Sequence, residues 1–145
     1  MEVKIFKKRE NARTPRKATE GSAGFDLYAC IDHDIIIDPM KRVLIPTGVA
    51  IELPNNECAA FIFPRSGLGV NHGLTLSNSV GVIDSDYRGE ILVSIINLNN
   101  EKYTIKPKDR IAQLIVMPVY NFKIEQVESL STTNRGIGGF GSSGK

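Results

Sequence analysis

The chain is built from short apolar runs separated by turn-forming residues, and it has almost no helical periodicity. The runs are rich in Val, Ile, Phe and Thr, and turn signals such as Pro54-Asn55-Asn56 interrupt them. Such a pattern is typical of an all-β sandwich or barrel. It predicts a short helix at 66–71 and strands at 3–6, 25–29, 35–37, 43–45, 49–53, 58–63, 74–76, 81–83, 90–97, 102–105, 111–117 and 124–127.

Length and composition fit one folded domain. The chain has 145 residues, of which 41% are hydrophobic and 23% charged, as expected for a globular protein with one core. No apolar run approaches the roughly 18 residues that cross a bilayer, and the start Met1-Glu2-Val3-Lys4 lacks a secretory signal. We therefore expect a soluble, intracellular protein, cytoplasmic or otherwise, with no membrane partner.

A small β domain has many strand edges, and such edges are often covered by association with another chain. We therefore expect an oligomer. The apolar, proline-interrupted stretch at 114–119 could be exchanged between subunits, or it could equally well be ordinary core.

Cysteine, histidine and basic residues argue against several kinds of site. Cys30 and Cys58 are expected to be reduced thiols on strands, and His33 and His72 are too isolated for a metal cage. Any metal should therefore be bound through oxygen. Seven of the 18 basic residues lie at 4–17, but no nucleic-acid motif accompanies them, so we expect no direct nucleic-acid partner.

The segment 129–145 is rich in Gly, Ser and Thr and cannot build a core. It carries the cation Arg135, the ring of Phe140, and glycines whose amides can approach phosphate oxygens. A phosphate and a ring together suggest a nucleotide. Composition alone leaves a solvated linker equally open. The apparent P-loop match at 139–145 is rejected, because that loop needs a preceding strand and a following helix.

Four internal segments place polar or glycine residues where a β-protein would otherwise place simple turns, and the tail adds a fifth. They lie at 22–29 (SAGFDLYA), 64–68 (PRSGL), 81–91 (GVIDSDYRGEI), 108–115 (KDRIAQLI) and 135–144 (RGIGGFGSSG). In order and spacing the five segments resemble the motifs of the trimeric deoxyuridine triphosphatase (dUTPase) family, and the resemblance runs from residue 21 to residue 144.

The resemblance implies a distorted jelly-roll or β-clip barrel with strand exchange in a homotrimer. It implies a β domain at 1–128 and a flexible glycine-rich lid at 129–145. The implied reaction is hydrolysis of dUTP to dUMP and pyrophosphate with Mg²⁺, which limits uracil entry into DNA and supplies dUMP for dTMP synthesis.

Asp84 is the expected catalytic residue. It follows an apolar strand and opens a turn, a good place for a general base, although such an aspartate is more often a turn cap. The resemblance implies that Asp84 activates the water that attacks the α-phosphorus. It also implies that the ring of Tyr87 packs against deoxyribose and excludes a 2′-hydroxyl. Asp86 is assigned no catalytic role.

The family selects its base with a hairpin whose backbone mimics a pairing partner for uracil. Here the hairpin would run from Asn78 through Gly81, Val82 and Ile83 and return near Leu92. The Asn78 amide can both donate and accept, which suits the O4 and N3 edge of uracil. Leu92 departs from the lysine or methionine expected at its position, so the role of that side chain stays open.

The remaining roles concern phosphate and metal. The resemblance implies that Arg65, Ser66 and Gly67 hold the phosphate chain, that Gln113 reaches the α-phosphate, and that Asp26 holds Mg²⁺ through a water. Mg²⁺ keeps several waters and takes ligands from phosphates, so no dense carboxylate cluster is needed.

The tail would complete the site. Arg135 is expected on the γ-phosphate and Phe140 on the uracil ring, and Gly141 and Ser142 are expected to bind substrate as well. The resemblance further implies three shared active sites per trimer. Each would combine the segments that carry Asp26, Arg65 and Gln113 from one subunit, the Asp84 hairpin from a second, and the tail from a third.

Two other functions compete with dUTP hydrolysis, namely dCTP deamination and non-catalytic nucleotide binding. The dCTP deaminases share the implied fold, but they need a glutamate beside C4 of the base and a different arginine–serine pattern. A regulatory nucleotide-binding module without catalysis is less compatible with the presence of Asp84, Gln113, Arg135 and Phe140, although a partner-binding role beside catalysis stays open.

Overall fold

The computed structural model describes residues 2–139. Its elements in chain order are β1 (Lys4–Lys7), β2 (Phe25–Tyr28), β3 (Ile35–Ile37), β4 (Arg42–Pro46), β5 (Val49–Glu52), β6 (Cys58–Phe63), α1 (Ser66–His72), β7 (Leu74–Leu76), β8 (Gly81–Ile83), β9 (Leu92–Asn97), β10 (Tyr103–Ile105) and β11 (Arg110–Pro118). The all-β prediction is confirmed, and the short helix lies where the sequence indicated it. No helix in the described part of the chain is long and apolar enough to span a membrane.

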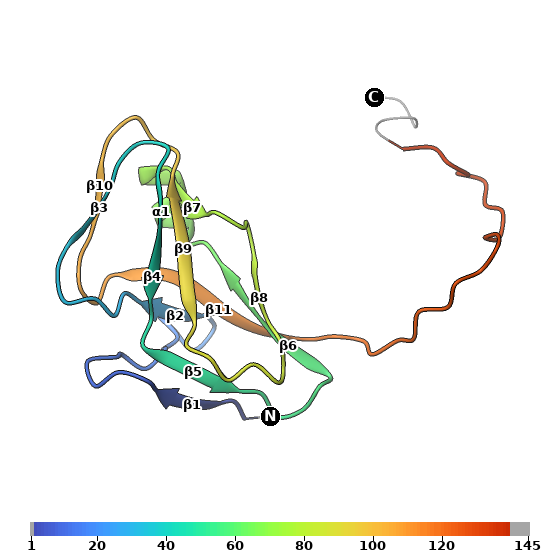
Figure 1. The fold of residues 1–145 in the computed structure, drawn as a ribbon, viewed down its shortest axis with the longest axis horizontal. Helices are drawn as coiled ribbons and strands as arrows, with labels where there is room; N and C mark the ends of the chain where they lie inside the picture. Colours follow the sequence, from blue (N-terminus) through green and yellow to red (C-terminus); the bar gives the residue numbers. More distant parts are fainter. Residues whose placement is uncertain (1, 140–145) are drawn as a thin grey trace.

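The strands form antiparallel sheets that pack around one core. A four-stranded sheet has the order β2-β11-β6-β8, and a three-stranded sheet has the order β4-β9-β7. Two-stranded ribbons, β1-β5 and β10-β3, flank them. In Figure 1 the long strand β11 runs crosswise to β4 and β9. Buried residues from both larger sheets belong to a single hydrophobic cluster, so the core lies where these sheets face each other.

Strand β9 shows how the core is formed. Val93 and Ile95 point inward and are buried, whereas the alternating residues are exposed or half-buried, as the two-residue period of a strand requires. The last inward position is Asn97. Its amide donates to the carbonyls of Ile37 at 2.9 Å and Glu101 at 2.7 Å, which fixes the β3–β10 ribbon to β9. Because its donors are satisfied, this buried polar side chain is compatible with the core.

Both cysteines are buried free thiols, as predicted. The thiol of Cys30 donates to the side-chain oxygen of Asn11 at 3.0 Å. Burial raises the pKa of the Cys30 thiol, because the thiolate would lose its solvation. Cys30 therefore serves as a small core residue.

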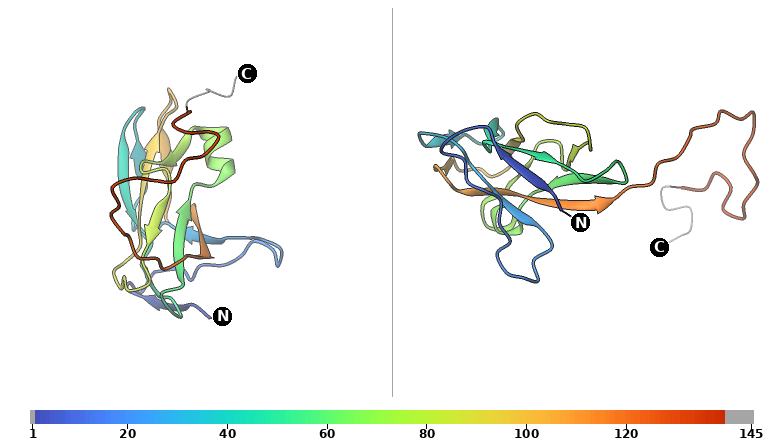
Figure 2. Two further views of the ribbon diagram at one scale, coloured as in Figure 1. Left: turned by 90° about the vertical axis from the view of Figure 1, so that its right-hand side faces the viewer. Right: turned by 90° about the horizontal axis from the view of Figure 1, so that it is seen from below.

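Strand β11 is the last regular element of the described chain, and the segment after it runs away from the sheets (Figures 1 and 2). The backbone N–H of Val119 donates to the carbonyl of Glu57 at 2.9 Å, and the Asn121 amide donates to the carbonyl of Asn56 at 3.0 Å. The stretch 114–119 thus lies largely in β11, paired with β2 and β6 of its own chain.

The strand predicted at 124–127 is wrong for the single chain. The segment begins and ends with the β-branched residues Ile124 and Val127, but it has left the sheets, and within residues 2–139 no backbone pairs with it. The large apolar side chains of the longer stretch 120–130 are exposed, and they are Tyr120, Phe122, Ile124, Val127 and Leu130. The division into a domain at 1–128 and a lid at 129–145 stays a prediction.

Gly48 lies in the tight connection between β4 and β5, and its substitution tests how closely this connection is packed. Its φ is +73°, and a Cβ atom there would lie 2.5 Å from Cβ of Ala12 and 2.7 Å from Sγ of Cys30. We predict that Gly48→Ala lowers the free energy of unfolding by about 2–4 kcal/mol, because both the backbone conformation and the space exclude a side chain. Urea denaturation followed by circular dichroism measures this change.

The control is Gly21→Ala, since a Cβ at Gly21 would have no atom within 4 Å. Equal destabilisation in the two variants would contradict this explanation.

Candidate active site

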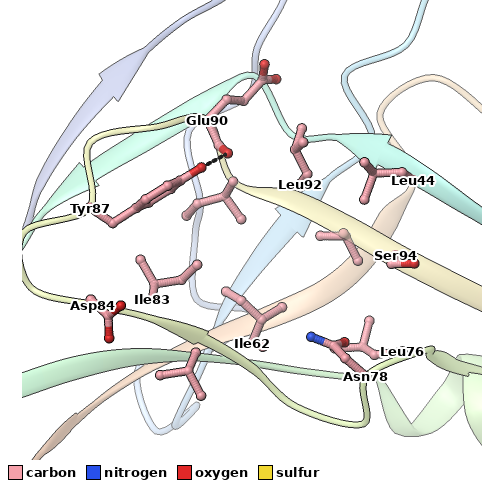
Figure 3. A pocket seen from close by; sticks show the side chains of 14 residues that line it. Leu44, Ile62, Leu76, Asn78, Ile83, Asp84, Tyr87, Glu90, Leu92 and Ser94 are labelled. Carbon is pink, nitrogen blue, oxygen red and sulfur yellow. Dashed lines mark hydrogen bonds between the residues drawn. The ribbon is translucent and has the colours of Figure 1, made fainter.

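A cleft of about 350 Å³ opens between β8 and β9 and the loop that joins them (Figure 3). All seven residues that the sequence assigned to the hairpin, for the base, the sugar and catalysis, line it. They are Asn78, Gly81, Val82, Ile83, Asp84, Tyr87 and Leu92. The apolar side chains of Leu44, Ile62 and Leu76 contribute to its walls. The structure therefore brings the hairpin group together. We call this cavity the hairpin cleft.

Gly81 lets β8 approach β6 closely. The two strands pair with Gly81 opposite Ile62, and a Cβ on Gly81 would lie 3.2 Å from Cβ of Ile62. It would also lie 3.7 Å from the amide nitrogen of Asn78. The glycine thus leaves the backbone edge of β8 open beside the Asn78 amide, where fixed donors and acceptors can face a planar ring.

Asp84 begins the turn that follows β8. Its carbonyl accepts a hydrogen bond from the N–H of Tyr87 at 3.1 Å, which closes the turn. Its side chain is exposed, and within residues 2–139 no side-chain hydrogen bond or ion pair engages the carboxylate. Asp84 thus does cap a turn with its backbone, while its carboxylate stays available to accept a proton from water.

Tyr87 stands at the same end of the hairpin cleft as Asp84 (Figure 3). Its hydroxyl donates to the carbonyl of Glu90 at 3.0 Å, and 42% of the residue is exposed. A Cβ on Gly89 would collide with the Tyr87 ring and hydroxyl, so a glycine is required beneath the ring. The exposed part of the ring offers a flat apolar surface beside Asp84.

A second, more open cavity of about 280 Å³ lies at the N-terminal end of α1. It contains the residues that the sequence assigned to phosphate and metal, namely Asp26, Arg65, Ser66, Gly67 and Gln113. Asp26 on β2 and Gln113 on β11 are directly paired in register. The Gln113 amide donates to the carbonyl of Pro64 at 3.0 Å, which holds it beside Arg65. We call this cavity the arginine cleft.

Two guanidinium groups hold the Asp26 carboxylate. Arg65 donates to one oxygen at 3.0 Å, and Arg110 donates to the other at 3.3 Å. Arg65 also donates to the Arg110 carbonyl at 3.3 Å. Arg110 had no expected role, and its place in the 108–115 segment is the only sequence signal that points to it. Two cations share one carboxylate, so these three side chains at and beside the wall of the arginine cleft together carry a net positive charge.

The two clefts share no lining residue and lie apart in the same chain. On β6, Phe63 pairs with Gln113 of β11, whereas Ala60 pairs with Ile83 of β8. Gln113 and Ile83 are thus separated by two strand spacings across the sheet and by the three residues from Phe63 to Ala60 along β6. These two offsets place their backbones about 14 Å apart. The hairpin cleft and the arginine cleft are therefore separate cavities of one chain.

Of the predicted tail residues, only Arg135 lies within the described part of the chain. Arg135 lies in an exposed turn at 134–137, where its Nε donates to the carbonyl of Gly138 at 3.0 Å, and it lines neither cleft. Phe140, Gly141 and Ser142 lie outside the described residues.

Comparison with known proteins identifies the family. The family model for dUTPase matches residues 10–144. A deoxyuridine 5′-triphosphate nucleotidohydrolase of Neisseria meningitidis serogroup B is 48% identical over 144 residues, which cover 99% of this chain and 96% of that protein. One from a Janthinobacterium species is 49% identical over 145 residues, covering 100% and 97%. The chain belongs to the dUTPase family, and it is an enzyme of that family.

Solved structures agree with this assignment. The dUTPase of Staphylococcus bacteriophage 80alpha, solved with dUPNHPP, superposes with a TM-score of 0.88 at 26% identity, and the match covers 99% of each chain. The fold of this chain is thus the dUTPase fold.

The Asp26 carboxylate gives a prediction about stability. Its side chain is only 12% exposed and balances Arg65 and Arg110. We predict that Asp26→Asn lowers the free energy of unfolding by about 1–2 kcal/mol, because two partly buried guanidiniums lose their shared anion. Urea denaturation at pH 7 measures this change.

Asp38→Asn is the matched control, because the Lys102–Asp38 pair is largely exposed and should contribute about 0–1 kcal/mol. If the Asp26 variant proved as stable as the control, the carboxylate would not be holding the arginine cleft together.

Proposed function

We propose that this enzyme hydrolyses dUTP to dUMP and pyrophosphate, with Asp84 as the general base. The observation that carries the proposal is the hairpin cleft, which collects the seven hairpin residues expected for base, sugar and catalysis in a chain of the dUTPase family. In an intracellular setting the reaction limits uracil entry into DNA and supplies dUMP for dTMP synthesis.

Uracil would bind along the open edge of β8. The Asn78 amide donates and accepts, and the backbone at 81–83 presents fixed polar groups beside it. A site of this kind rejects a base with the wrong hydrogen-bonding pattern by roughly 10⁴-fold, because its own buried groups would be left unpaired. Cytosine would be rejected because its amino group has the wrong hydrogen-bonding pattern, and thymine would be rejected because of its methyl group.

The ring of Tyr87 would pack against the deoxyribose and leave no room for a 2′-hydroxyl. Its place beside Asp84 supports this role, because the sugar lies between the base and the α-phosphate in the nucleotide. The enzyme then selects the sugar with the same hairpin that selects the base.

Asp84 would take a proton from the attacking water. As the water oxygen bonds to the α-phosphorus, the bond from that phosphorus to the oxygen bridging to the β-phosphate breaks, and pyrophosphate leaves. The exposed Asp84 carboxylate, with no internal partner among residues 2–139, is free to hold that water. No covalent intermediate is proposed.

The triphosphate would lie in the arginine cleft. Arg65 supplies positive charge, the amides of Ser66 and Gly67 begin α1 and so lack partners within the helix, and Gln113 reaches the α-phosphate. Arg135 on the γ-phosphate, and Phe140, Gly141 and Ser142 on the substrate, complete this assignment from the tail.

Asp26 fits Mg²⁺ only through a bound water. Both of its oxygens are engaged by arginines, and no group of three His, Cys, Asp or Glu side chains gathers for a metal within residues 2–139. A carboxylate has about four lone-pair positions, so Asp26 can still accept a hydrogen bond from a metal-bound water. Mg²⁺ on the triphosphate would draw negative charge from the phosphates.

A homotrimer with three shared active sites would bring the two clefts together. One chain holds its Gln113 and its Asp84 hairpin about 14 Å apart, whereas both must reach the same phosphate. The arginine cleft of one subunit would therefore face the hairpin cleft of a second, and the third would contribute its tail. The unpaired apolar segment at 120–130 supports strand exchange in such a trimer.

The direct test of the reaction is pyrophosphate release with Mg²⁺ from dUTP, dCTP, dTTP and UTP in parallel, with ammonia measured in the dCTP sample. We expect cleavage of dUTP alone. Ammonia from dCTP would indicate a deaminase, and dUTP binding without cleavage would indicate a regulatory module.

We predict that Asp84→Asn lowers kcat for dUTP by about 10³-fold while dUTP binding is kept, because the amide cannot accept a proton from water. Single-turnover kinetics and calorimetric titration measure the two quantities. Asp86→Asn is the control, since Asp86 lies in the same turn but lines neither cleft. Comparable losses in both variants would remove the special role of Asp84.

A further inference from the structure

The orientation of the Tyr87 ring depends on the backbone that follows it. With 42% of the residue exposed, the ring is held on one side by Gly89 and at its hydroxyl by the Glu90 carbonyl, 3.0 Å away. A shift of residues 89 and 90 would therefore carry the ring with it.

The side chain of Glu90 holds this backbone in place by contacts far along the chain. Its carboxylate accepts hydrogen bonds from Nε of Arg9 at 2.9 Å and from Nη2 of Arg9 at 3.1 Å, so the two side chains meet at two points. Oε1 of this carboxylate, which accepts from Nε of Arg9, also accepts from the N–H of Gly48 at 2.8 Å. Hydrogen bonding to Glu90 raises the pKa of Arg9, in keeping with a close ion pair.

Each of the two donors is fixed in turn. Gly48 can turn its N–H toward Glu90 because its φ is +73°, and its carbonyl accepts from the N–H of Lys8 at 2.7 Å. That second bond holds the backbone next to Arg9. The Glu90 side chain is 20% exposed, so these contacts are partly shielded from water. The N-terminal loop, the start of β5 and the hairpin therefore meet at one carboxylate.

We propose that Glu90, held by Arg9 and Gly48, is a positioning residue that fixes the Tyr87 ring and thereby sets the discrimination between dUTP and UTP. The proposal rests on the function proposed above, because it concerns the sugar that the hairpin cleft accepts. Glu90 acts through the Tyr87 hydroxyl and does not itself touch the reacting atoms. Loosening Glu90 gives the ring room to move, and that room admits a 2′-hydroxyl.

The test compares kcat/KM for dUTP and for UTP in the full-length wild type, Arg9→Met, Arg9→Lys and Glu90→Gln. Arg9→Met keeps the aliphatic part of the side chain but removes the two-point contact with Glu90. Because Arg9 lies 81 positions from Glu90 in sequence, the substitution leaves the hairpin sequence itself unchanged. We expect it to raise the UTP/dUTP ratio of kcat/KM about tenfold, since misplacement by about 1 Å has effects of this order or larger. Arg9→Lys and Glu90→Gln keep part of the contacts and should give smaller rises.

Asp38→Asn is the matched control, because it breaks an exposed ion pair on the β3–β10 ribbon and should leave the ratio unchanged. A merely structural role for the Arg9–Glu90 pair would lower both kcat/KM values equally. An unchanged ratio in folded Arg9→Met, or in the two milder variants if that one does not fold, would overturn the proposal. A wild type that accepts UTP as readily as dUTP would overturn the proposed sugar selection as well.

Discussion

The antiparallel register of β11, β6 and β8 is the constraint on which the rest of the structure depends. It buries the apolar faces of three strands in one core and fixes where the polar residues at their ends can lie. Gln113 and the Asp84 hairpin are thereby assigned to opposite sides of β6, about 14 Å apart. A change of register by one residue would turn the inward side chains outward, so this separation cannot be adjusted without loss of the core.

The separation has a chemical consequence. The arginine cleft carries an excess of positive charge, since a single carboxylate lies between Arg65 and Arg110. A general base placed among those cations would be engaged by them, as Asp26 is, whereas the Asp84 carboxylate has no side-chain partner within residues 2–139. Under the proposed mechanism, placing the base and the phosphate-binding cations on different parts of the chain would leave each in the state that hydrolysis needs. In the proposed trimer, assembly of subunits would bring the two groups to the same phosphorus atom.

Much of the fold could be predicted from the sequence, because short apolar runs between turn signals report local structure directly. The strand at 124–127 was wrong because its pattern shows that a segment can pair, but not whether a partner strand lies in the same chain. Motif order likewise identified the hairpin residues, which are near one another in sequence. It could not reveal Arg110 beside Asp26 or Arg9 beside Glu90, since these contacts join residues 84 and 81 positions apart.

The most direct test of the shared site is to mix two inactive chains. One carries Asp84→Asn with its tail intact, and the other keeps Asp84 but ends after Ser131. Each is refolded alone and in an equal mixture, and dUTP hydrolysis is measured. If hairpin and tail come from different subunits, the mixture should recover about a quarter of the wild-type sites, while each chain alone stays inactive. A mixture as inactive as its components would contradict the shared site.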